Sequence, residues 1–141
     1  MSELNPALIP LSLYIHMPWC VRKCPYCDFN SHAVPDGQLS TDLEQQYLAA
    51  LLADFETQLE MAQGRSIHSV FIGGGTPSLI SAQGYTWLFE QLRARLDFEP
   101  DCEITLEANP GTVEHDPFAD YLAAGINRLS IGVQSFNTEH L

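Results

Sequence analysis

Three cysteines lie within eight consecutive residues, in the stretch CVRKCPYC at positions 20–27. Cysteine thiolates bind zinc in structural sites and are the standard ligands of iron-sulfur clusters. A structural zinc site needs four closed ligands, whereas a [4Fe-4S] cube held by three thiolates keeps one iron open to an added ligand. The spacing C-x3-C-x2-C therefore favours a cluster held by Cys20, Cys24 and Cys27, with one open position where chemistry can occur.

Two other kinds of site remain as alternatives. His16 or His32 could complete a zinc site of three cysteines and one histidine. A thioredoxin-like redox site would use only the last two cysteines, and the sequence gives no sign of a helix that starts at this motif. The fourth cysteine, Cys102, lies far away beside a β-rich run, and we expect it to be a small apolar residue at a strand edge.

The composition limits the partners and the compartment. The chain has 141 residues, of which 45% are hydrophobic, and this is enough for one compact domain. Six Lys and Arg against 18 Asp and Glu give a net charge of -12, which repels nucleic acid and anionic lipid. No apolar run approaches the roughly 20 residues of a membrane span, and the N-terminus does not resemble a signal peptide. We therefore expect a cytoplasmic protein without a nucleic-acid partner or a membrane span.

The cysteines lie in a predicted loop, residues 17–40, that follows the first of four predicted strands. Short β-rich runs predict strands at 12–16, 69–73, 103–107 and 128–134. Amphipathic patterns between them predict outer helices. A strand-then-helix alternation indicates a parallel sheet with right-handed crossovers, so the expected fold is α/β.

Each predicted helix has a start signal. Thr41 and Glu44 form a capping-box pattern, and Ser81 can cap the second helix. Asp116 is predicted to be the N-cap of a short third helix, with the following proline in its first turn and Gly125 at its end. Four such strands leave one sheet edge and one face uncovered. We therefore expect residues 1–141 to be a single domain and the N-terminal part of a longer protein, truncated on its C-terminal side.

A glycine-rich segment and two polar residues lie at the carboxyl ends of the predicted strands, where ligands of parallel sheets bind. Residues 73–78 (GGGTPS) follow the second strand, Glu107 ends the third and Gln134 ends the fourth. Consecutive glycines let a ligand approach the backbone. Each feature alone is more typical of a tight turn or a solvated edge, but together they indicate one site. Tyr14, in the first strand, is by its alternation alone predicted to be a core residue.

The cysteine spacing, with the aromatic Tyr26 just before the last cysteine, resembles the signature of the radical S-adenosylmethionine (SAM) superfamily. The resemblance implies a [4Fe-4S] cluster whose open iron is chelated by SAM. It implies cleavage of SAM to methionine and a 5′-deoxyadenosyl radical, with the cofactors carrying the chemistry. The implied fold is a partial, TIM-like (β/α)6 barrel, of which this chain would supply the first four strands.

The resemblance also implies roles for particular residues. The glycine segment matches the element that binds the SAM ammonium, and the polar strand ends match contacts to the nucleoside. His16 and Trp19 flank the loop, where they would shield the cluster or hydrogen-bond its sulfurs. The implied cofactor contacts are Tyr14, Tyr26, Gly74, Gly75, Thr76, Glu107 and Gln134.

Longer segments narrow the resemblance. PLSLYIHMPWCVRKCPYCDFNSHA, FIGGGTPSL, ITLEANPGT and GINRLSIGVQSF resemble the oxygen-independent coproporphyrinogen III oxidase group. The oxidases proper have a further cysteine two residues after the third, where this sequence has Phe29. That difference favours the HemW-type haem chaperones of the same group, which bind haem and pass it to acceptors.

This branch implies haem or a porphyrinogen as ligand, together with a haem-accepting protein and an electron-donor protein as partners. Whether the protein is an enzyme stays open at this point. The alternative is an oxidase that uses the radical to remove a propionate β-hydrogen from coproporphyrinogen III. A remote alternative is a zinc-stabilised interaction domain without SAM or a cluster.

Overall fold

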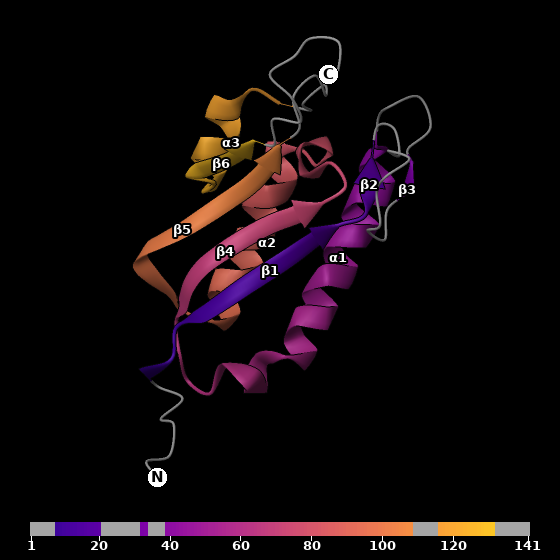
Figure 1. Cartoon of the computed structure of the whole chain (residues 1–141). Helices are drawn as coiled ribbons and strands as arrows, with labels where there is room; N and C mark the ends of the chain where they lie inside the picture. The colour runs from indigo at the N-terminus through magenta and orange to yellow at the C-terminus, as the bar shows by residue number, and fades with distance from the viewer. Residues whose placement is uncertain (1–7, 21–31, 34–38, 109–115, 132–141) are drawn as a thin grey trace.

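A computed structural model of the chain describes residues 8–20, 32–33, 39–108 and 116–131 (Figure 1). Its centre is a four-stranded sheet in the order β1-β4-β5-β6, and every neighbouring pair of strands is parallel. The strands are β1 (Leu11–Met17), β4 (Ile67–Gly74), β5 (Phe98–Ala108) and β6 (Arg128–Ile131). The predicted parallel α/β fold is confirmed, although residues 132–134 of the fourth predicted strand lie outside the described residues.

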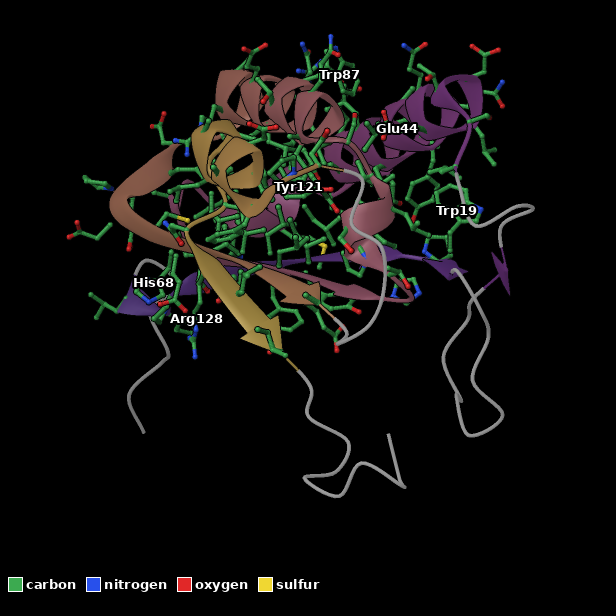
Figure 2. The ribbon with its side chains drawn as sticks, turned by 90° about the horizontal axis from the view of Figure 1, so that it is seen from above. Trp19, Glu44, His68, Trp87, Tyr121 and Arg128 are labelled. Atoms are coloured by element: carbon green, nitrogen blue, oxygen red, sulfur yellow. The ribbon has the colours of Figure 1, made fainter. Side chains whose placement is uncertain are left out.

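Among the described residues, three helices cover one face of this sheet and none covers the other, as Figure 2 shows. They are α1 (Thr41–Thr57), α2 (Ala82–Arg95) and α3 (Phe118–Ala124). Two short 3-10 helices, η3 (Leu59–Ala62) and η4 (Pro77–Leu79), follow α1 and β4. Within the predicted loop 17–40, the strands β2 (Trp19–Cys20) and β3 (His32–Ala33) form a separate parallel pair.

The core lies between the sheet and the helices. Alternate strand residues such as Ile15, Ile72 and Leu106 point toward the helices and are almost fully buried. Burying each such side chain contributes roughly 1.5–3 kcal/mol to folding. The residues between them, including Tyr14 and Phe71, are exposed on the uncovered face. The period of two in each strand therefore separates a packed face from a face that is open to a ligand or to further strands.

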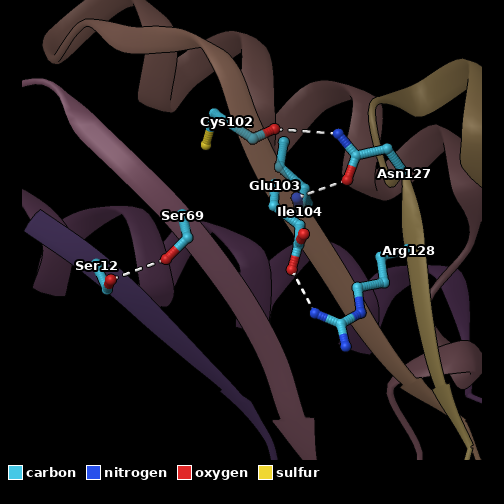
Figure 3. Close-up of polar contacts among 7 residues, drawn as sticks. All are labelled: Ser12, Ser69, Cys102, Glu103, Ile104, Asn127 and Arg128. Carbon is cyan, nitrogen blue, oxygen red and sulfur yellow. Dashed lines mark hydrogen bonds and ion pairs between the residues drawn. The ribbon is translucent and has the colours of Figure 1, made fainter.

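Side chains also connect neighbouring strands (Figure 3). Ser12 Oγ lies 2.8 Å from Ser69 Oγ, and Arg128 donates to Glu103 Oε1 at 2.6 Å. Asn127, just before β6, accepts a hydrogen bond from the Ile104 N–H at 2.8 Å through its side chain. The first contact joins β1 to β4, and the other two hold β6 beside β5.

The start of α1 differs from the prediction by one residue. Ser40, and not Thr41, is the N-cap, because its hydroxyl accepts a hydrogen bond from the Leu43 N–H at 3.2 Å. Glu44 therefore does not stand at the third helical position that a capping box requires. Its carboxylate binds Ser81 at the start of α2. A contact across 37 residues has replaced the expected local one.

The other helix ends show one confirmation and one correction. Ser81 caps α2, as predicted, with its hydroxyl 3.0 Å from the Gly84 N–H. The N-cap of α3 is Pro117, whereas Asp116 accepts a hydrogen bond from the Ala82 N–H at 2.7 Å. The first N–H groups of α2 lack partners within their own helix, so a carboxylate brought close by the fold is attracted there. No helix in the described part of the chain combines the length and apolar character that a membrane span requires.

Candidate functional site

The ends of β1, β4 and β5 bring the predicted site residues together. The register pairs His16 with Gly73, and Glu107 points toward the same strand end. The Gly74 N–H donates a hydrogen bond to Glu107 Oε2 at 3.2 Å. The structure thus places the carboxylate beside the glycine segment, as the strand order predicted.

The first two glycines of the segment make room for the protein's own side chains. A Cβ on Gly73 would lie 3.0 Å from Glu107 Oε2 and 3.2 Å from Tyr14 Cε2. Gly74 has a φ of +110°, and its Cβ would lie 2.5 Å from the Met17 carbonyl oxygen. Gly74 therefore requires glycine before any ligand is considered, whereas a Cβ on Gly73 would require neighbouring side chains to shift. From the sequence, this segment was expected either to form a tight turn or to let a ligand approach the backbone.

The next two residues connect the glycine segment to the start of the cysteine loop. The Gly75 N–H donates to the Met17 carbonyl and the Thr76 N–H donates to the Trp19 carbonyl, both at 2.6 Å. These donors are therefore already engaged within the protein. A ligand at this segment would meet carbonyl oxygens, which accept hydrogen bonds and suit an ammonium group.

Tyr14 lies on the uncovered face and not in the core. Its side chain is 55% exposed, and its ring stacks on Phe71 with centroids 6.2 Å apart. The hydroxyl lies 3.1 Å from His16 Nδ1. Partial burial raises the pKa of the Tyr14 phenol above its ordinary value, and the nearby Glu107 carboxylate raises it further. The prediction from alternation alone was therefore wrong, and Tyr14 presents a protonated hydroxyl beside Glu107.

Tyr47, on α1, supports the strand end from the helical side. Its hydroxyl donates to the His16 carbonyl, and its ring meets Trp19 edge to face with centroids 4.4 Å apart. Tyr47 was not among the site residues predicted from the sequence. Its hydroxyl could have indicated this role, because a partly buried tyrosine needs a polar partner.

The structure leaves the metal ligands as a prediction. Only the backbone of Cys20 is described, as part of β2, and Cys24, Tyr26, Cys27 and Gln134 lie outside the described residues. Within the described residues, no group of three histidine, cysteine or acidic side chains could hold a metal. Cys102 is buried in β5, and burial raises the pKa of its thiol, so it behaves as the expected small apolar residue.

A parallel sheet with a cysteine loop after its first strand, and glycine and carboxylate groups at the next strand ends, defines a class of cofactor-binding proteins. The family model of the radical SAM superfamily matches residues 14–141, and this chain belongs to that superfamily. The family implies SAM and a [4Fe-4S] cluster as cofactors.

More specific relatives carry the name of a haem chaperone. The chain is 55% identical over 140 residues to the heme chaperone HemW of Haemophilus influenzae, and 58% identical over 134 residues to that of Escherichia coli. It is 38% identical over 133 residues to the mitochondrial radical S-adenosyl methionine domain-containing protein 1 of Danio rerio. These matches cover 96%, 95% and 94% of this chain, and 36%, 34% and 29% of the relatives. The chain thus spans about a third of their length.

A solved structure shares the fold. Coproporphyrinogen III oxidase (HemN) of Escherichia coli, described as a radical SAM enzyme, superimposes with a TM-score of 0.79 at 35% identity. The match covers 96% of this chain and 30% of the oxidase. The predicted radical SAM fold is therefore confirmed over almost the whole chain.

Proposed function

We propose that this chain is the cluster- and SAM-binding part of a HemW-type haem chaperone, which binds haem and passes it to an acceptor protein. The observation that carries the proposal is the identity of 55% and 58% to two proteins named as heme chaperones. Identity to the oxidase of known structure is 35%. Phe29, where the oxidases have a further cysteine, agrees with this difference.

In this proposal Cys20, Cys24 and Cys27 would hold a [4Fe-4S] cluster and would leave one coordination position for SAM. When both are bound, the reduced cluster supplies the electron that cleaves SAM. The adjacent residues fit such a ligand. Carbonyl oxygens of the glycine segment would accept from the ammonium, and the Glu107 carboxylate would accept from the ribose hydroxyls or the ammonium.

The remaining contacts come from both sides of this centre. Tyr14 would donate its hydroxyl toward the cofactor, since a phenol is protonated at neutral pH and the pKa of this one is raised further. Tyr26 and Gln134 would complete the site from the cysteine loop and from the end of the fourth strand. The Met17 and Trp19 carbonyls, held by Gly75 and Thr76, would fix the loop entrance relative to the glycine segment. We place the protein in the cytoplasm, where thiols stay reduced.

The function is tested on the full-length protein after anaerobic cluster reconstitution. Reductant, SAM and coproporphyrinogen III are added, and deoxyadenosine and decarboxylated porphyrinogen are quantified together. A separate titration measures haem binding and transfer to an apo-haem protein. The chaperone proposal predicts stoichiometric haem binding and transfer without decarboxylated product. Turnover to the decarboxylated product would overturn it.

The oxidase is the second candidate, because the solved structure that shares the fold is an oxidase. Its distinguishing result is formation of deoxyadenosine in proportion to decarboxylated product. A zinc-stabilised interaction domain is the remaining alternative. It predicts a colourless protein, whereas an iron-sulfur cluster gives a broad visible absorption band from sulfur-to-iron charge transfer.

A further inference from the structure

A groove of about 470 Å³ separates the first turns of α1 and α2, in the helical layer away from the uncovered sheet face. Its floor is formed where the two helices approach closely at Gly84. A Cβ on Gly84 would lie 3.0 Å from Leu48 Cδ1 and 3.1 Å from Glu44 Oε2. The proposed cofactor site uses neither this groove nor these residues.

Glu44 is a buried carboxylate on the lining of the groove, with 7% of its surface exposed. Oε1 accepts from the Ser81 N–H at 2.5 Å and Oε2 accepts from the Ser81 hydroxyl at 2.9 Å. These bonds fix the side chain, but a carboxylate can accept about four. Within the described residues Glu44 forms no ion pair, and its charge faces the partial positive charges at the starts of α1 and α2.

Trp87 lines the same groove from α2, one turn after Gly84, and is 38% exposed. Figure 2 shows Trp87 on the outer side of α2 and Glu44 between the two helices. An aromatic face combined with a carboxylate is the usual means of recognising a cationic side chain. Among the described residues the lining holds no lysine or arginine, and it includes the amide groups of Gln45 and Gln83.

We propose that this groove is a docking site for an arginine side chain of a protein partner. The guanidinium would stack on Trp87 and donate to Glu44, and the neighbouring amides would bind the partner's backbone. Charge complementarity supports a basic partner, because the chain carries 18 acidic against six basic residues. Arginine is favoured over lysine since its planar group both stacks and donates in a fixed geometry.

The test uses full-length protein labelled with 5-fluorotryptophan and two matched peptides, acetyl-Ala-Arg-Ala-amide and acetyl-Ala-norleucine-Ala-amide. The fluorine resonance of Trp87 is assigned by its loss in Trp87→Phe. We expect the arginine peptide alone to shift this resonance in a saturable way, with millimolar affinity. An equal response to both peptides, or no saturable shift, would overturn the proposal.

Variants at Gln45 test the charge without disturbing the Ser81 bonds. Gln45 is exposed on the lining, so we expect both Gln45→Glu and Gln45→Lys to fold. Gln45→Glu should tighten the arginine peptide about twofold to fivefold, and Gln45→Lys should weaken it by a similar factor. Glu60→Lys, in η3, is the control and should leave the affinity unchanged. Equal effects at positions 45 and 60 would show nonspecific attraction and would contradict a site in the groove.

Discussion

Glu107 Oε2 accepts a hydrogen bond from the backbone N–H of Gly74 across 3.2 Å, from the neighbouring strand of the sheet. This contact fixes the carboxylate beside the glycine segment. It also explains part of the glycine requirement, because a Cβ on Gly73 would lie 3.0 Å from the same oxygen. The ends of β4 and β5 therefore contact each other directly within the protein. The proposed SAM contacts at the glycine segment and Glu107 use the same residues.

Glu107→Gln separates the charge of this side chain from its position. The amide oxygen can still accept from Gly74, so we expect the free energy of unfolding to change by less than about 1 kcal/mol. SAM affinity of the reconstituted protein should fall about tenfold or more, because a charged acceptor becomes neutral. Equilibrium dialysis with SAM measures this. Glu103→Gln, in the exposed pair with Arg128, is the matched control and should bind SAM normally.

Gly74→Ala should destabilise the protein much more than Gly64→Ala. Both glycines have positive φ angles, +110° and +77°, so each substitution has a backbone cost of roughly 1–2 kcal/mol. Only the Cβ on Gly74 meets other atoms, at 2.5 Å from Met17 O, whereas that on Gly64 meets nothing within 4 Å. Urea denaturation should show the difference, at about 1 kcal/mol or more. Equal losses of stability in the two variants would mean that the end of β4 can shift to accommodate the added Cβ at position 74.

Tyr85→Phe should reduce the loss of stability at alkaline pH. Burial raises the pKa of the Tyr85 phenol well above its ordinary value, and Tyr121 and Glu44 raise it further. A raised folded-state pKa contributes stability that is complete below the unfolded pKa of about 10 and is lost as pH rises beyond it. The wild-type protein should therefore lose up to about 1.4 kcal/mol per pH unit above pH 10 from this residue.

The variant also lacks the hydrogen bond from Tyr85 to the Pro77 carbonyl at 2.6 Å. It should be less stable by about 0.5–1.5 kcal/mol at pH 7 and should have a shallower slope above pH 10. Denaturant titrations at several pH values measure both quantities. If the free energy of unfolding falls with pH above pH 10 as steeply in the variant as in the wild type, groups other than Tyr85 cause the loss of stability.

Cys24→Ala and Cys102→Ala compare a predicted cluster ligand with a buried packing residue. Removing one of three thiolates should abolish most cluster loading, as measured by iron content and visible absorption after anaerobic reconstitution. Cys102→Ala should keep full loading and lose roughly 1 kcal/mol of stability, because the side chain packs in the core. Similar loss of iron in both variants would contradict the assignment of Cys102.

The local features of the fold were predictable from the sequence. The β-rich runs predicted the four strands of the central sheet but not β2 and β3, which lie in the predicted loop. The Ser81 cap and the Gly125 stop were predicted correctly, since each depends on residues within one turn. The cap of α1 was misassigned by one residue. Glu44 and Asp116 both serve the start of α2, across 37 and 34 residues, and no local pattern encodes such contacts.

The sequence by itself determined the order of strands and helices, the cysteine spacing and the strand ends at which polar groups stand. These follow from hydrophobic periodicity and from the ligand requirements of metals. Only the tertiary structure decided that Tyr14 faces the open side beside His16, and that Gly73 and Gly74 leave room for neighbouring side chains and for the Met17 carbonyl. Alternation gives two faces to a strand, and packing of the helices decides which one is buried.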